Sequence, residues 1–551
     1  MNFELDTLSY ALITSIIGAA ALLSVRNSKS PDIHPLLLNT QSDVSRLRHP
    51  EESAVYRSRM YPMGTPLCST FDRAIRTMAD FYKAGGLEKN TNSDFLYQQS
   101  GGYLDYGTVG KKIKPIYQGL RIIAGLEPQT QNENSFVGIY AKNSQYTVLT
   151  EIACHCNGLV TIPISSYASS SHLSYIIQKT ALKVLIAESD LVDHILSLAQ
   201  DTSLKQVVVL GEISDINQEK ANQIGIQLFS FDEMEAKGKS AVFDTITVVP
   251  NDFATIYFSS SALKESKNGV ILTHKNLLSS ISSYLLVIPP QQRFSSKDRL
   301  LLNLPIDNVF RYVLTAAVSL LGGSIAFNEQ ETDDENIDVG TYLTHIATVK
   351  PTIFVSGPIF LRQVKHLIES RYNKSFLFKR GYSVKKEYLE EGRLVNDCKY
   401  DMLVFRDIRQ KMFGGNLRLI YIDNDDNMDP SLATFLRIIL STQVLQTFNL
   451  TETVSSITAS MFYDYNADPK ATGAPLPCNE IKLVDVKELS LTAEDQPNPR
   501  GEIWVRGNNV FAGYYNNSSA TTDVLDTDGW YTTGYLGEIL PNGTLKVIGK
   551  K

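Results

Sequence analysis

A serine-rich loop at residues 259–269 contains the residue types that phosphate chemistry requires. Hydroxyl and ammonium groups can donate hydrogen bonds to the negative oxygens of phosphates. Phosphate-binding loops also need glycines, because only glycine lets the backbone approach the phosphates closely. The stretch therefore indicates either a weakened phosphate-binding loop or an ordinary loop after a strand. Its candidate donors are Ser259, Ser260, Ser261 and Lys267.

The elements that must position this loop alternate between short apolar runs and longer helical patterns. Such alternation predicts βαβ units and parallel sheets that are covered on both faces. From about residue 449 onward, short runs are instead separated by Pro and Gly turns, which indicates a small β-rich subdomain. Two series of apolar runs predict two α/β sheets in tandem: 136–140, 159–164, 183–187 and 206–210, and then 254–258, 299–305, 324–327, 352–356 and 417–422.

Five longer blocks make the pattern specific. They lie at residues 252–277, 447–453, 473–486, 501–517 and 528–551. In this order and spacing they resemble the AMP-forming acyl-CoA synthetase superfamily, most closely its long-chain fatty-acid branch. The resemblance implies a large module of two α/β sheets and a small β subdomain, with the active site at their junction. It also implies a reaction, the ATP-dependent adenylation of a carboxylate followed by its transfer to CoA.

The nucleotide contacts that this resemblance implies are altered in the sequence. Ser261 and Lys264 stand where the family's phosphate loop has glycines. Asp423 begins an acidic stretch that matches the family's small adenine-contacting turn, and Asn308 matches a family histidine. Tyr535 replaces the aspartate that binds both ribose hydroxyls, and a tyrosine cannot accept two hydrogen bonds as a carboxylate does. We therefore expect a vestigial nucleotide pocket without functional catalytic residues.

Thr451 and Glu452 keep the family pattern. The resemblance assigns a Mg²⁺ contact to Glu452, so that this residue is a metal ligand only if ATP binds. Retained capping and packing at this turn is the equally weighted alternative. Family members also continue with a mobile lid domain that carries a catalytic lysine, whereas this sequence stops at Lys551. We expect the lid domain to be absent.

The N-terminal segment Thr7–Val25 contains no charged residue. Its length is close to the roughly 20 residues that cross a hydrocarbon core of about 30 Å. Arg26 and Lys29 follow it, and this charge bias would leave the bulk of the chain on the cytosolic or matrix side. A buried core helix is the alternative. We expect a single-pass anchor that contacts lipid in a mitochondrial or endoplasmic reticulum membrane.

Length and composition bound the remaining organisation. The 551 residues are too many for one compact core. A hydrophobic content of 43% and a charged content of 20% are typical of a globular protein. The net charge of −7 gives no reason to expect a nucleic-acid partner. We expect an anchor at 1–30, an AMP-binding-like core of two subdomains at 31–448, and the β-rich subdomain at 449–551.

Three functions remain open from the sequence. Loss of one preorganised donor typically costs on the order of 10²–10³ in rate, and several donors are altered here. We therefore favour a catalytically degenerate protein, or pseudoenzyme, without cofactors, which acts as an accessory subunit of a membrane protein complex. The first alternative is a residually active long-chain fatty acid–CoA ligase that uses ATP, Mg²⁺ and CoA. The second is a module that binds a fatty acyl ligand without catalysis.

Overall fold

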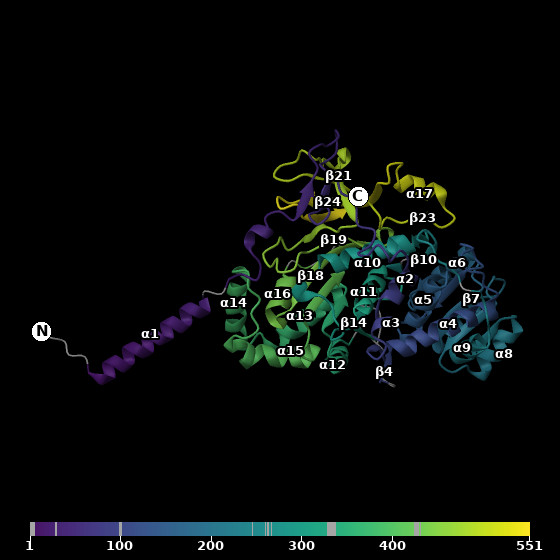
Figure 1. Ribbon diagram of the computed structural model, residues 1–551, viewed down its shortest axis with the longest axis horizontal. Coiled ribbons are helices and arrows are strands. Elements are labelled where there is room, and N and C mark those ends of the chain that lie inside the picture. Colours follow the sequence, from purple (N-terminus) through teal and green to yellow (C-terminus); the bar gives the residue numbers. More distant parts are fainter. Residues whose placement is uncertain are drawn as a thin grey trace.

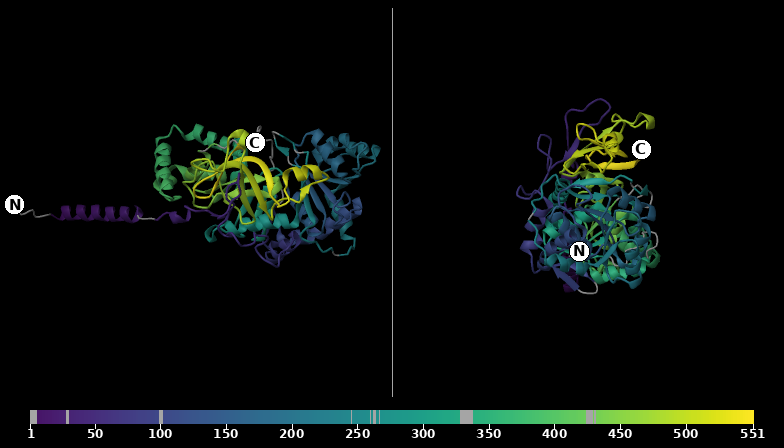
Figure 2. Two further views of the ribbon diagram at one scale, coloured as in Figure 1. Left: turned by 90° about the horizontal axis from the view of Figure 1, so that it is seen from above. Right: turned by 90° about the vertical axis from the view of Figure 1, so that its right-hand side faces the viewer.

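The computed structural model describes residues 6–27, 30–98, 102–244, 246–258, 260–261, 264–265, 267–327, 338–423, 429 and 431–551. These residues form a mixed α/β body from which one helix projects (Figures 1 and 2). The projecting helix is α1 (Thr7–Asn27). The α/β class expected from the sequence is confirmed.

One sheet has eight strands, and the loop at 259–269 connects two of them, β10 and β13. Strand β10 and the five strands beyond it are parallel, while β13 and β23 are antiparallel to their neighbours. Most residues of these parallel strands are buried, because helices cover both faces of the sheet. In spatial order the strands are β23 (Gly513–Tyr514), β13 (Val270–Thr273), β10 (Phe253–Tyr257), β6 (Val160–Ile164), β5 (Phe136–Tyr140), β7 (Val184–Glu188), β8 (Gln206–Leu210) and β9 (Gln227–Ser230).

The second sheet has fifteen strands and includes the β-rich C-terminal part of the chain. Strand β20 pairs with both β19 and β25, so the C-terminal strands continue the α/β sheet instead of forming a separate one. In spatial order the strands are β1 (Ser42–Val44), β2 (Tyr56–Ser58), β21 (Asn479–Val484), β22 (Arg500–Gly507), β24 (Tyr531–Ile539), β25 (Leu545–Lys550), β20 (Ala471–Pro475), β19 (Ser455–Ala459), β18 (Gln443–Leu450), β17 (Leu419–Asp423), β16 (Ile353–Ser356), β14 (Arg299–Asn303), β15 (Ser324–Phe327), β3 (Asp94–Gln98) and β4 (Gly102–Asp105).

Helices pack against both faces of the eight-stranded sheet and of the α/β part of the fifteen-stranded sheet. The helices that share one hydrophobic core with both sheets are α2 (Met78–Ala84), α4 (Tyr106–Ala124), α5 (Gln145–Cys156), α9 (Phe231–Lys239), α10 (His274–Val287) and α11 (Val309–Leu320). A second core packs α6 (Ser170–Thr180), α7 (Val192–Leu198) and α8 (Asp215–Gln223) against the other face of the eight-stranded sheet. A third core packs α12 (Val339–Val349), α13 (Pro358–Tyr372), α14 (Phe376–Glu390), α15 (Arg406–Phe413) and α16 (Leu432–Leu440) against the fifteen-stranded sheet. Two shorter helices are α3 (Gly86–Lys89) and α17 (Ser518–Val524).

The expected membrane anchor is wrong. The segment Thr7–Val25 does fold as a helix, but in the part of the chain that the structure describes no helix is long and apolar enough to cross a membrane. The location in a membrane that was inferred from this anchor is therefore also without support.

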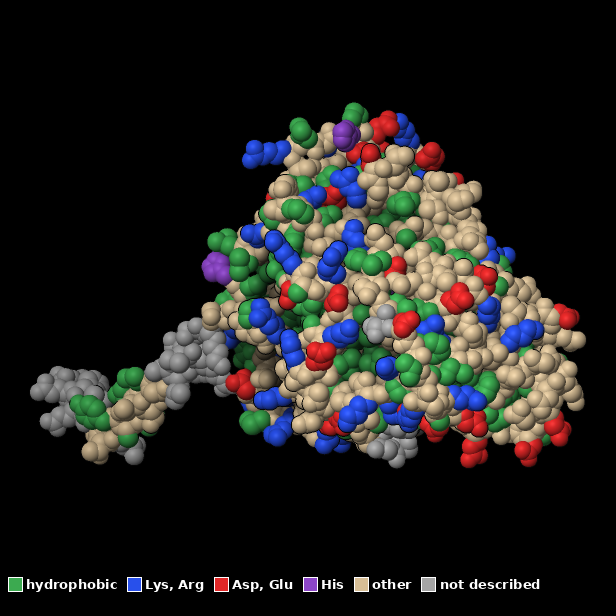
Figure 3. All heavy atoms as spheres, turned by 45° about the vertical axis from the view of Figure 1, so that its right-hand side comes forward, with side chains coloured by type: hydrophobic (Ala, Val, Ile, Leu, Met, Phe, Trp, Pro, Cys, Tyr) green, Lys and Arg blue, Asp and Glu red, His purple; other side chains and the backbone are tan. Residues whose placement is uncertain are grey.

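Both signs of charge are interspersed on the surface. Figure 3 shows lysine and arginine side chains mixed with aspartate and glutamate over the face in view, next to scattered hydrophobic ones. The expected domain boundaries at residues 30 and 448, and the expected absence of a lid domain, remain predictions.

Candidate functional site

The serine-rich loop is described only in part. Residues 260–261 and 264–265 form the antiparallel pair β11 (Ser260–Ser261) and β12 (Lys264–Glu265). Ser259 lies outside the described residues, and the side chains of β11 and β12 are not described. The proposed phosphate contacts of the three serines therefore remain predictions.

The end of this loop is fixed by its backbone. Lys267 is exposed, and its carbonyl oxygen accepts a hydrogen bond of 2.7 Å from the Tyr175 hydroxyl. The Gly269 carbonyl accepts a 2.7 Å bond from the backbone N–H of Tyr515. A Cβ on Gly269 would lie 2.5 Å from the Phe258 ring, so the glycine is required by packing. The Lys267 side chain is therefore carried at the surface by a well-anchored backbone.

A polar cluster lies at the carboxyl ends of parallel strands in the second sheet. Asp423 ends β17 and accepts a 2.6 Å hydrogen bond from Asn308 Nδ2 and another from Asn449 Nδ2. Asn308 also caps α11, since its Oδ1 accepts from the Phe310 N–H at 2.9 Å. Ligands of open α/β sheets bind at this edge. The structure therefore brings Asn308 and Asp423, which lie far apart in the sequence, into one site.

Tyr535 joins the same region from strand β24. Its ring packs edge-on against Phe448, with centroids 5.2 Å apart, and the Lys550 ammonium lies 5.0 Å from its centroid. Phe448 directly precedes Asn449, the residue that binds Asp423. The tyrosine is thus held by aromatic and cation–π contacts. The vestigial ribose contact assigned to this position by the resemblance remains a prediction.

Glu452 follows the cluster in the short 3₁₀ turn at Thr451–Thr453. Its Oε1 accepts a 3.0 Å hydrogen bond from the Tyr514 hydroxyl, and its carbonyl oxygen accepts from the Phe511 N–H at 2.8 Å. Burial raises the pKa of the Glu452 carboxyl above its ordinary value, although the Tyr514 bond opposes this change. Thr451 accepts the Val454 N–H through its carbonyl oxygen, at 3.1 Å. The turn is therefore closed by local hydrogen bonds.

Glu452 has the chemistry of a Mg²⁺ ligand but offers a single carboxylate. Magnesium prefers oxygen ligands and is often held by one or two carboxylates together with substrate phosphates and water. Among the described residues, no group of three or more His, Cys, Asp or Glu side chains is arranged to hold a metal ion. A magnesium ion at Glu452 would thus need the phosphates of a nucleotide to complete its coordination.

An apolar cavity of about 350 Å³ lies beside the polar cluster. Its volume falls within the roughly 300–1,000 Å³ typical of small-molecule sites. Strands β17–β20, the C-terminal half of α10 and the N-terminal segment around residues 37–60 form its wall. Representative lining residues are Tyr284, Val287, Tyr421, Leu445, Ala459 and Phe462.

Hydrogen bonds connect this cavity to the cluster. The Tyr284 hydroxyl bonds Ser456 Oγ, Ser456 donates to Asn449 Oδ1, and Asn449 binds Asp423. The Tyr421 hydroxyl is buried and has no hydrogen-bond partner among the described residues. A buried polar group without a partner is costly, and a bound ligand could supply one. The cavity and the polar cluster are therefore two parts of one candidate site.

Sequence reasoning missed several of these residues. Asn449 lies within the block at 447–453, and Tyr514 lies within the block at 501–517. Both blocks contribute to the family resemblance, but neither residue was assigned a role in the site. The cavity residues come from five separate strands or helices and from the N-terminal segment. No local pattern in the sequence could have grouped them.

Comparisons of the sequence with protein families and with curated proteins show which proteins this chain resembles. A family model described as "AMP-binding enzyme" matches residues 87–515. Long-chain-fatty-acid–CoA ligase 1 of Cavia porcellus is 28% identical over 506 residues, which cover 90% of this chain and 70% of that protein. Long-chain-fatty-acid–CoA ligase 5 of Rattus norvegicus is 28% identical over 427 residues, which cover 76% of this chain and 60% of that protein. The match thus spans about 60 to 70% of these relatives' own length.

Solved structures show the same fold. The crystal structure of a putative long-chain-fatty-acid CoA ligase from Rhodopseudomonas palustris CGA009 superposes with a TM-score of 0.63 at 19% identity. The superposition covers 86% of this chain and 99% of that one. At this identity the likeness concerns the fold alone.

Proposed function

The chain belongs to the family of AMP-binding enzymes, and from this premise we propose that it is an AMP-forming long-chain fatty acid–CoA ligase. The observation that carries the proposal is the apolar cavity beside the polar cluster at Asp423. A cavity of about 350 Å³ with mainly aromatic and aliphatic walls suits an acyl chain. The polar cluster then lies where the carboxylate and the nucleotide would meet. The names of the relatives point to two of the same substrates, CoA and a long-chain fatty acid.

Each part of the site has a place in this proposal. Asn308 and Asn449 hold the Asp423 carboxylate at the edge of the sheet, so that its position is fixed before a ligand arrives. Glu452 supplies an oxygen for Mg²⁺, which would neutralise charge on the phosphates when bound. Lys267 is an exposed cation at the end of the loop and can reach toward a phosphate. Burial of the acyl chain in the cavity supplies the affinity for long chains.

Filling the cavity tests its role. Ala459 lines it, and Ala459→Phe should abolish binding of palmitate while leaving octanoate binding largely intact, because a shorter chain needs less space. Ala236→Phe, on the exposed side of α9, is the matched control and should bind both acids normally. Isothermal titration with each fatty acid measures the effect. Equal palmitate affinity in both variants would show that the acyl chain binds elsewhere.

A second candidate function is favoured by the partners that the candidate nucleotide-binding residues already have within the protein. Glu452 is already bonded by Tyr514, Tyr535 is packed against Phe448, and Asp423 is already bonded by two amides. Groups satisfied in this way suit a catalytically degenerate protein that serves as an accessory subunit of a larger complex. Titration with ATP and Mg²⁺ separates the two candidates, since the ligase must bind the nucleotide and the accessory subunit need not. Micromolar binding would eliminate the second candidate.

A further inference from the structure

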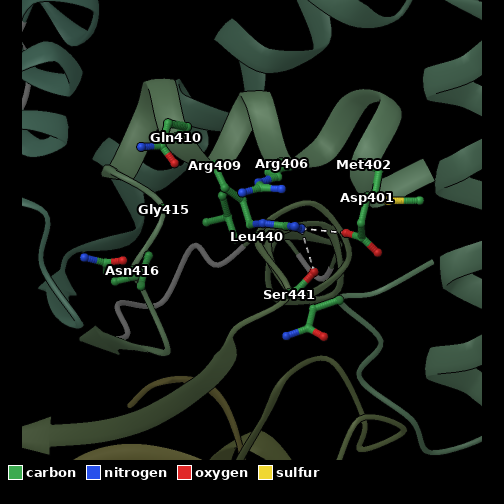
Figure 4. Close-up of a pocket in the computed structure, with 11 residues that line it drawn as sticks. Asp401, Met402, Arg406, Arg409, Gln410, Gly415, Asn416, Leu440 and Ser441 are labelled. Atoms are coloured by element: carbon green, nitrogen blue, oxygen red, sulfur yellow. Dashed lines mark hydrogen bonds and ion pairs between the residues drawn. The ribbon is translucent and has the colours of Figure 1, made fainter. Parts of the chain in front are cut away.

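A second, polar cavity of about 430 Å³ lies at the start of α15, between this helix and the end of α16 (Figure 4). It is lined by Asp401, Arg406, Arg409, Gln410, Asn416 and Ser441, among others. A π-helical turn, Asp401–Phe405, leads into α15 at this point. Turns of this kind are rare and frequently occur at functional sites. None of these residues belongs to the site described above.

A buried ion network forms the floor of the cavity. Asp401 Oδ1 accepts hydrogen bonds from Lys385 Nζ at 2.7 Å and from Arg409 Nη1 at 2.6 Å. Ser441 Oγ accepts from the same two groups, at 2.6 and 2.9 Å. Figure 4 shows Arg409 pointing to both oxygens. Nη1 of Arg409 donates both side-chain hydrogen bonds of this residue, to Asp401 and to Ser441. The Nε and Nη2 atoms of Arg409 therefore have no partner among the described residues.

Positive charge exceeds negative charge in this cluster. Arg406 lies three residues before Arg409 on the same helix face, is exposed, and forms no ion pair with any described residue. Arg406 and Arg409, which line the cavity, and the adjacent Lys385 thus bring three positive charges to a cavity whose lining has one carboxylate, that of Asp401. The cluster therefore has a surplus of about two positive charges. Asp407 does not offset it, since it pairs with Lys411 at 2.9 Å.

We propose that this cavity binds a phosphate monoester. A phosphate monoester carries about −1.5 to −2 charges at pH 7, which matches the surplus. The planar forks of two arginines suit its oxygens, as they bind phosphate bidentately. Gln410 and Asn416 add amides that can contact the esterified group, for which the volume leaves room. The site is independent of the proposed ligase activity.

The phosphate can belong to a soluble ester or to a lipid headgroup, and two measurements separate these sources. The first follows line broadening of glycerol 3-phosphate in ³¹P spectra as the full chain is added. The second measures co-sedimentation with phosphatidylcholine vesicles with and without phosphatidate. In the arm that shows binding, Arg406→Gln should weaken binding at least about tenfold, since it removes the charge of one charge-assisted hydrogen bond.

Two controls make this result specific. Arg380→Gln removes another exposed arginine outside the cavity and should leave binding unchanged. Lys267→Gln should also leave it unchanged, because Lys267 belongs to the proposed nucleotide site. Absence of binding in both arms, unchanged binding by Arg406→Gln, or a loss caused by Lys267→Gln would each overturn the proposal. Arg406 has no described ion pair to lose, so unfolding does not complicate its variant.

Discussion

At the scale of single residues, the candidate site is held by groups that satisfy one another. Glu452 is bonded by Tyr514, and Asp423 by Asn308 and Asn449. Hydrogen bonds to charged groups contribute roughly 1.5–3 kcal/mol, and their buried partners cost as much when left alone. These residues are therefore fixed in position whether or not a nucleotide is present.

The raised pKa of Glu452 makes a prediction about pH. In the folded state this carboxyl holds its proton more tightly than in the unfolded state, where its ordinary pKa is 4.5. Its contribution to the free energy of unfolding is therefore present below about pH 4.5 and is lost as pH rises through the raised pKa. Urea unfolding between pH 4 and 7 should show that Glu452→Gln loses less stability than the parent over this range. Parallel curves would contradict the assignment.

Removing the Tyr514 hydroxyl, which donates to the Glu452 carboxylate, tests the same hydrogen bond through its donor. Tyr514→Phe deletes the hydroxyl that bonds Glu452 and should destabilise the protein by about 1–3 kcal/mol at pH 7. The loss should shrink at pH 4.5, where more of the carboxyl is protonated. Tyr10→Phe, at a tyrosine that is 60% exposed, serves as the control in urea unfolding. An equal loss at both pH values would argue for packing instead of charge.

At the scale of elements, helices α5 and α11 share a buried ion pair between the two sheets. Arg311 and Glu151 form a bidentate pair, with the two side chains 0% and 2% exposed. Removing one partner of a buried pair typically costs about 3–5 kcal/mol, because the other charge is left unpaired. Arg311→Met should lower stability by this amount in urea unfolding. Arg311→Met with Glu151→Leu should recover most of the loss, and no recovery would show that packing dominates.

The join between the α/β strands and the C-terminal strands depends on Gly473. This residue has φ +100°, and a Cβ on it would lie 2.0 Å from the Ala459 carbonyl oxygen. Gly534 also has a positive φ, of +71°, but no atom lies within 4 Å of its Cβ position. Gly534→Ala should therefore cost about 1 kcal/mol from backbone strain alone, whereas Gly473→Ala should cost several times more. Similar midpoints of thermal unfolding would contradict this close approach.

At the scale of the whole molecule, the sequence predicted local elements better than their assembly. The run at 136–140 forms β5 with the expected bounds, because β-branched residues and buried faces decide a strand locally. The pairing of β20 with β25 was not predictable, since partners more than 70 residues apart leave no local signal. The expected anchor was wrong, since no helix among the described residues is long and apolar enough to cross a membrane.

In the candidate site, too, single residues could be predicted from the sequence but their contacts could not. Glu452 and Tyr535 were candidates from the motif blocks, and Asp423 was a candidate from its match to the family's adenine-contacting turn. The structure places Asp423 beside Asn449 and Tyr535 beside Phe448. What each of them contacts could not be read, because Tyr514 and Lys550 come from other strands. The apolar cavity was equally hidden, since it is a property of packing between elements.

We propose above all that this chain joins a long-chain fatty acid to CoA at the expense of ATP. The most direct measurement is the formation of palmitoyl-CoA and AMP from palmitate, CoA, ATP and Mg²⁺ by the purified chain, followed by mass spectrometry. We expect both products in equal amounts, a strong reduction by Glu452→Gln, and no product without palmitate. Absence of AMP and palmitoyl-CoA, in a preparation that is folded and binds palmitate, would contradict it.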